Sequence, residues 1–121
     1  MQHAALAYGK VAKEMSSPRE LEANLLLKAA SRLQGIRDAW DMKSGELGDA
    51  LLYNRKLWSI FLTSVTRPDN PLPQLVRQNV ANLGLFVMNH TISLTADPQR
   101  DKLLPLISIN REIAAGLLGR A

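Results

Sequence analysis

The sequence predicts an all-α protein: a single-domain bundle of about five helices with a rigid proline-rich loop between the third and the fourth. Apolar residues recur at the three- and four-residue spacing of helices, and no run alternates apolar and polar residues for long enough to form a strand. The length of 121 residues fits one domain, and a hydrophobic content of 46% supplies a core for it.

We expect a first helix over about residues 2–14 and a second from Ser17 to about Trp40. The Ser17 side chain can accept a hydrogen bond from a free backbone N–H, Pro18 suits a first helical turn, and Glu20 has the reciprocal capping position. The apolar residues of the second helix fall within one arc of about 140°, so this helix should bury one face. Residues 41–45 are expected to end it as a linker.

A third helix is expected from about Glu46 to Val65. Its apolar arc consists of Leu47, Leu51, Leu57, Trp58, Phe61, Leu62 and Val65. Asn54 projects into the middle of this arc and Arg55 lies near its edge. Burying an asparagine costs about 1–3 kcal/mol unless its amide is hydrogen-bonded. Asn54 therefore belongs either to a satisfied polar network that fixes helix register or to a contact with a partner.

The proline-rich segment 66–73 predicts a stiff connector, because proline fixes backbone angles and restricts the preceding residue. A fourth helix should follow from Pro73 or Gln74 to Ile92, with apolar residues on two sides. One arc contains Leu75, Val76, Val80, Leu83, Phe86 and Val87; the other contains Ala81, Leu85, Met88 and Ile92. A helix of this kind lies at the centre of a bundle, which we expect here, or also packs against a partner.

Asp97-Pro98 is a further helix-start signal, and Pro105 predicts a break or a late start in the last helix. From Leu103 to Leu118 the apolar arc is very wide and contains Asn110. This is more apolar surface than a small bundle hides, and exposed apolar patches commonly mark interaction sites.

Charge and composition exclude several function classes. The net charge of +4 comes from residues 51–121, whose eight basic side chains are scattered rather than gathered in a stripe, so direct nucleic-acid binding is not favoured. The chain has no cysteine, two histidines and no phosphate-binding glycine loop. No apolar run approaches the ~18 residues of a membrane helix, and the N-terminus lacks the pattern of a secretory signal. We expect a soluble, intracellular non-enzyme without membrane insertion, cofactor, metal or small-molecule substrate.

Three segments carry a resemblance to a known family: Tyr53–Phe61 (YNRKLWSIF), Asn70–Pro73 (NPLP) and Leu75–Val87 (LVRQNVANLGLFV). They resemble the FlaF family of flagellar biosynthesis regulators of alphaproteobacteria. Residues 4–8 and 17–22 also fit, and the resemblance covers nearly the whole chain. Residues 66–69 and 90–105 depart from the family pattern.

The resemblance implies a cytoplasmic protein that binds flagellin as an export chaperone and promotes flagellin synthesis and secretion. It also implies a functional link with FlbT, a regulator of flagellin mRNA translation. The alternative is a post-transcriptional regulator of that mRNA, acting with or against FlbT and touching RNA only indirectly or weakly.

Large aromatic side chains dominate interface energetics, so Trp58 and Phe61 are candidate anchors for a partner. The other interpretation is that both, like Phe86, belong to the core. Leu72 on the stiff loop is a further candidate. The full set of candidate partner-binding residues is Asn54, Arg55, Trp58, Phe61, Asn70, Leu72, Arg77, Asn79, Asn82 and Phe86.

Overall fold

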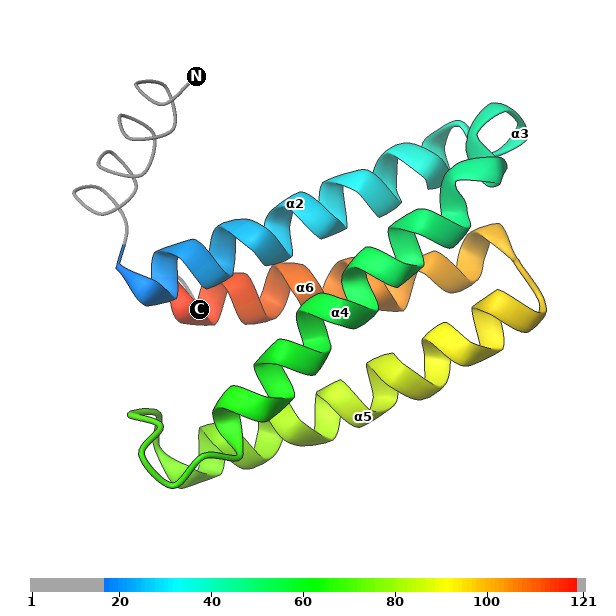
Figure 1. The fold of residues 1–121 in the computed structure, drawn as a ribbon. Coiled ribbons are helices and arrows are strands. Elements are labelled where there is room, and N and C mark those ends of the chain that lie inside the picture. The colour runs from blue at the N-terminus through cyan, green and yellow to red at the C-terminus, as the bar shows by residue number, and fades with distance from the viewer. Residues whose placement is uncertain (1–16, 120–121) are drawn as a thin grey trace, which may run out of the picture.

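The computed structural model describes residues 17–119, which form an all-α bundle with four main helices (Figure 1). The elements are α2 (Pro18–Asp38), α3 (Trp40–Lys43), η1 (Ser44–Glu46), α4 (Leu47–Val65), α5 (Gln74–Ala96), η2 (Arg100–Leu103) and α6 (Leu104–Leu117). No strand occurs among these residues, which confirms the predicted fold class. The first expected helix, over residues 2–14, lies outside the described residues.

The helices form two antiparallel pairs, α2 with α6 and α4 with α5, and α4 also packs on α2 (Figure 1). The start of α2 and the end of α6 lie at the same end of the bundle (Figure 1). The buried core is built mainly from aliphatic side chains of all four main helices, with Trp58 and Phe61 as its aromatic members. Three polar side chains are buried with them: Asn54, Thr91 and Asn110.

Several helix ends follow from local chemistry. Ser17 Oγ accepts a hydrogen bond of 3.1 Å from the Glu20 backbone N–H and Pro18 opens α2, as predicted. Pro105 occupies the first turn of α6, so the late start is also confirmed. Asp97-Pro98 does not begin a helix. The next helical residues are those of the short 3₁₀ turn η2, which begins at Arg100.

Two further boundaries differ from expectation. The second helix ends at Asp38, and the expected linker 41–45 is itself helical, in α3 and η1. The helix expected to end at Ile92 continues to Ala96. No proline or glycine occurs between Ile92 and Ala96, so the chain has no local reason to leave the helix before Asp97-Pro98.

Gly84 sets the close approach of α4 and α5. A Cβ atom on Gly84 would lie 2.8 Å from Leu62 Cγ, inside van der Waals contact. The missing side chain therefore lets α5 pack directly on α4 at this point. The proline-rich loop joins the end of α4 to the start of α5 (Figure 1).

Candidate functional site

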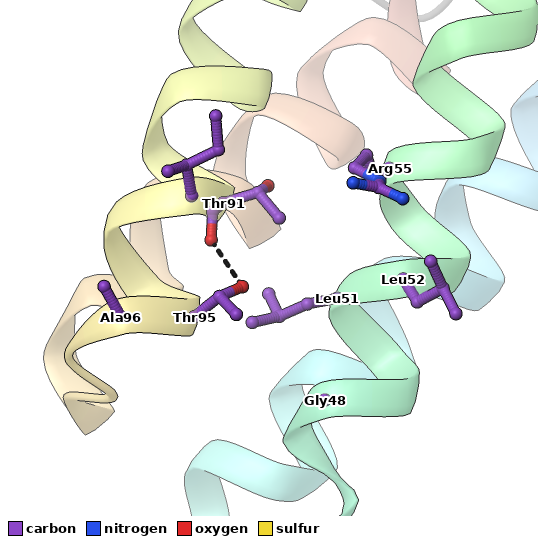
Figure 2. A pocket seen from close by; sticks show the side chains of 8 residues that line it. Gly48, Leu51, Leu52, Arg55, Thr91, Thr95 and Ala96 are labelled. Carbon is purple, nitrogen blue, oxygen red and sulfur yellow. Dashed lines mark hydrogen bonds between the residues drawn. The ribbon is translucent and has the colours of Figure 1, made fainter.

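A groove opens between α4 and α5, toward the end of the pair that lies away from the proline-rich loop (Figure 2). Its volume is about 530 Å³. Its walls are Gly48, Leu51, Leu52 and Arg55 from the first half of α4 and Thr91, Ile92, Thr95 and Ala96 from the last half of α5. The two helices are in close contact at Gly84 and Leu62. They diverge toward the end of the pair that carries the groove (Figure 1).

The walls of the groove are mainly apolar. The two threonine hydroxyls donate to backbone carbonyls within α5: Thr91 Oγ1 to Val87 O at 2.6 Å and Thr95 Oγ1 to Thr91 O at 2.8 Å. These hydroxyl protons are therefore already used. Arg55 is the charged side chain on the walls, and it is exposed (Figure 2). The groove thus combines an apolar surface with one fixed positive charge.

The outer edge of the groove continues along α5 as an apolar stripe, defined here as Ala81, Leu85, Met88 and Ile92. Leu85 and Ile92 are 60% and 64% exposed, and Ala81 and Met88 are half-buried. The opposite arc supplies the buried residues Val80, Val87 and Leu94. The stripe is the second apolar arc predicted from sequence: Ala81 and Met88 pack partly against the core, while Leu85 and Ile92 are left exposed.

The expectation that this helix lies at the centre of the bundle is wrong. α5 packs chiefly on α4 and only slightly on α6, whereas α2 packs on both α4 and α6. α5 is therefore a peripheral helix with one buried arc. The second apolar arc of α5 therefore does not face the centre of the described bundle.

The candidate anchors Trp58 and Phe61 are core residues, with exposed fractions of 0% and 5%. Their rings pack at a centroid distance of 5.8 Å. Phe61 faces the interior because it lies one turn from Trp58 on the same side of α4. Neither side chain can touch an occupant of the groove in this conformation.

Asn54 is also fully buried. The prediction that it belongs to a hydrogen-bonded network holds for its side-chain oxygen but not for its side-chain nitrogen. Asn54 Oδ1 accepts a hydrogen bond of 2.7 Å from Asn110 Nδ2, while Asn54 Nδ2 is buried with no partner among the described residues. Asn110 also receives a hydrogen bond from Trp58 and donates to Leu26 O on α2. Sequence reasoning placed Asn110 in an apolar arc without pairing it; two asparagines in facing arcs are the signal for such a network.

Asn70, Leu72 and Arg77 hold the proline-rich loop. Asn70 Nδ2 donates to Ser64 O at 3.0 Å, and Asn70 Oδ1 accepts from the Leu72 backbone N–H at 3.0 Å. Leu72 packs partly buried against the core. Arg77 Nη1 donates to the carbonyl of Arg67 at 3.0 Å. These contacts give the three side chains a structural role in the connector.

The remaining candidates lie on the outer face of α5. Asn79, Asn82 and Phe86 are exposed and fall within an arc of about 60° at helical spacing. Phe86 is 44% exposed and stacks on His90 at a centroid distance of 5.2 Å. His90 Nε2 donates to Lys102 O at 2.6 Å, which fastens η2 to α5. Of the predicted set, only Arg55 lines the groove; its apolar partners Leu52 and Ile92 were not among the candidates.

The comparison with known proteins decides the family. The family model described as "Flagellar protein FlaF" matches residues 4–117. The chain belongs to the FlaF family. No curated protein and no solved structure gives a significant match. This FlaF-family chain has no helix within its described part that is long and apolar enough to cross a membrane.

Proposed function

We propose that this protein binds flagellin and acts as its cytoplasmic export chaperone. The observation that carries the proposal is the apolar stripe on α5, whose Leu85 and Ile92 are exposed beside an open groove. Membership of a flagellar family restricts the range of partners. The terminal helices of flagellin, which stay unpacked until the filament assembles, are the cargo surface that such a chaperone would cover.

The mechanism is equilibrium binding of an amphipathic helix in a groove, with release at the export gate. Covering the partner's apolar surface would suppress premature aggregation and keep the cargo competent for export. No covalent step is needed. The chaperone only has to hold the unpacked segment more tightly than that segment associates with itself.

The free energies of burial and association determine how much of α5 must contact the partner. Burying the exposed part of Leu85 or Ile92 contributes about 1–2 kcal/mol each. Association costs about 4–15 kcal/mol in lost translational and rotational freedom. A contact confined to the groove would therefore be weak. Stable binding therefore requires an occupant that extends beyond the groove along the apolar stripe and buries additional surface there.

Calorimetric titration of the full chain with monomeric flagellin from the same organism, at low and high salt, tests the proposal. We expect binding with a negative heat-capacity change and weak salt dependence, because apolar burial dominates. Absence of binding to soluble flagellin would overturn the chaperone role. FlbT and flagellin mRNA would then be titrated, and contacts to RNA phosphates would show as affinity that falls steeply with salt.

A further inference from the structure

We infer that the groove between α4 and α5 takes an amphipathic helix of the partner whose apolar face carries an aspartate or glutamate, and that Arg55 pairs with this carboxylate. The inference rests on the proposed function and names what the groove recognises. Three observations support it: the state of Arg55, the charge of the surrounding helices and the hydrogen bonding of the walls.

Arg55 is a cation without a described counterion. The ion pairs among residues 17–119 are Arg37 with Asp101 and Lys102 with Asp97, and neither involves Arg55. No hydrogen bond from its guanidinium to another described residue is found either. Its side chain lies on the groove wall, exposed, beside the apolar Leu51 and Leu52 (Figure 2). A partner carboxylate would find five N–H donors there in a fixed fork.

The helices around the groove carry no negative charge that could replace a partner carboxylate. α5 contains no aspartate or glutamate in its 23 residues. α4 contains one, Asp49, which at 100° per residue lies about 120° around the helix from Arg55. Two further carboxylates flank these helices: Glu46 precedes α4, and Asp97 follows α5 and pairs with Lys102. Arg55 is therefore the charged side chain on the groove walls, and it favours an acidic side chain on the occupant.

The walls select a helix as the occupant. Both walls are α-helices, whose backbone N–H and C=O groups are already paired within each helix. An extended segment would bring unpaired backbone groups against apolar side chains with nothing to bond to. A helix pairs its own backbone and presents side chains alone. The sparse charge and the absence of aromatic side chains from the walls also favour a protein segment over RNA.

The test measures binding of intact monomeric flagellin to the full chain and to matched variants. Arg55→Gln and Arg55→Glu remove and reverse the charge, and Lys56→Gln is the control because Lys56 is adjacent in sequence but does not line the groove. Ile92→Asp disrupts the apolar wall. Ile60→Asp is its control, because Ile60 is exposed to the same extent, 69% against 64%, and lies outside this groove. Far-ultraviolet circular dichroism and thermal unfolding establish that each variant folds.

We expect Arg55→Gln to weaken binding about tenfold and Arg55→Glu more, because reversal adds repulsion to the lost pair. Ile92→Asp should weaken binding by a similar or larger factor, and both controls should bind like the unmodified chain. A scan replacing single flagellin carboxylates by lysine should contain one change that restores affinity for the Arg55→Glu chain. Such a rescue identifies the paired acid.

The outcomes separate this inference from the proposed function. If flagellin binds the unmodified chain and every variant equally, the chaperone role stands and the groove is not its site. If Ile92→Asp abolishes binding while Arg55→Gln leaves it unchanged, the charge pairing is wrong. If the chain forms a dimer that Ile92→Asp dissociates, or binds RNA in a way that Arg55→Gln abolishes, the occupant is not a flagellin helix. If flagellin does not bind the unmodified chain, both proposals fail together.

Discussion

The indole Nε1–H of Trp58 on α4 donates a hydrogen bond of 2.9 Å to Asn110 Oδ1 on α6, across 52 residues of sequence. Asn110 Nδ2 donates in turn to Asn54 Oδ1 on α4 and, at 3.3 Å, to Leu26 O on α2. One buried amide thus connects the three helices that form the centre of the core. Apolar residues in place of the asparagines could pack at more than one register, whereas the hydrogen bonds of this network form at one.

Asn110→Ala is expected to lower the free energy of unfolding by about 2–4 kcal/mol. The change leaves the Trp58 indole N–H and Asn54 Oδ1 buried without partners, and each such group costs about 1–3 kcal/mol. Urea unfolding followed by circular dichroism measures the loss. Asn82→Ala, an exposed asparagine on α5, should change stability by less than about 0.5 kcal/mol.

Asn54→Ala should cost less than Asn110→Ala. Asn54 Nδ2 is already unpaired, and Asn110 Nδ2 keeps Leu26 O as an acceptor when Asn54 is truncated. The order of the two losses in the same urea experiment is the informative quantity. An Asn54 variant less stable than the Asn110 variant would show that Asn54, not Asn110, is the centre of the network.

Features of this fold that depend on residues close together in the sequence are predictable, and features that depend on contacts between distant helices are not. The start of α2 and the late start of α6 depend on Ser17, Pro18 and Pro105 and on neighbours within one turn, so the sequence predicts them. The burial of Trp58 depends on how α4 lies across α2 and α5 and brings this side chain to Asn110 of α6, which periodicity does not specify. Periodicity shows that α5 is apolar on two sides, but not which side finds a helix of the same chain.

The candidate site was predicted less well for the same reason. A groove is made by two helices that diverge, and its position depends on the contact at Gly84. Interface statistics favour large aromatics, which led to Trp58 and Phe61 as candidate anchors. The chain has only two phenylalanines and two tryptophans, and one of each, Phe61 and Trp58, is buried in the core.

Gly84→Ala is expected to destabilise the protein by roughly 1–3 kcal/mol, because the new Cβ overlaps the Leu62 side chain and the two helices must separate. Helix propensity acts in the opposite direction, by about 1 kcal/mol. Gly116→Ala provides the control: no atom apart from its chain neighbours and the backbone of its own helix lies within 4 Å of its Cβ position, so only the propensity gain applies and stability should rise. Adding Leu62→Ala to Gly84→Ala should remove the overlap and recover part of the loss.

Asn70→Ala should destabilise the chain by about 1–2 kcal/mol without changing affinity for flagellin. The Asn70 amide donates to Ser64 and accepts from the Leu72 backbone, so it holds the loop together. Asn70→Asp retains the acceptor for the Leu72 backbone N–H but loses the donor to Ser64. Its stability should therefore fall between that of the unmodified chain and that of Asn70→Ala. A folded Asn70→Ala chain with clearly weaker flagellin binding would instead give Asn70 a direct role in the interface.

Glu22→Gln should raise the melting temperature slightly at neutral pH and leave it unchanged near pH 3.5. Glu22 lies in a second hollow, beside Ser59, Ile60 and Arg67, and burial raises the pKa of its carboxyl above 4.5, with Arg19 partly opposing. The folded state therefore holds this proton more tightly than the unfolded chain does. Its contribution to stability is present below the unfolded pKa and is lost as the pH rises through the folded pKa.

The difference in melting temperature between Glu22→Gln and the unmodified chain isolates this carboxyl from the others that titrate in the same range. It should grow as the pH is raised from about 3.5 past 5 and then level off, because the buried charge forms only in the unmodified chain. Glu112→Gln on the exposed face of α6 controls for the loss of one negative charge. A difference that shrinks with rising pH would mean that attraction to Arg19, rather than desolvation, dominates at Glu22.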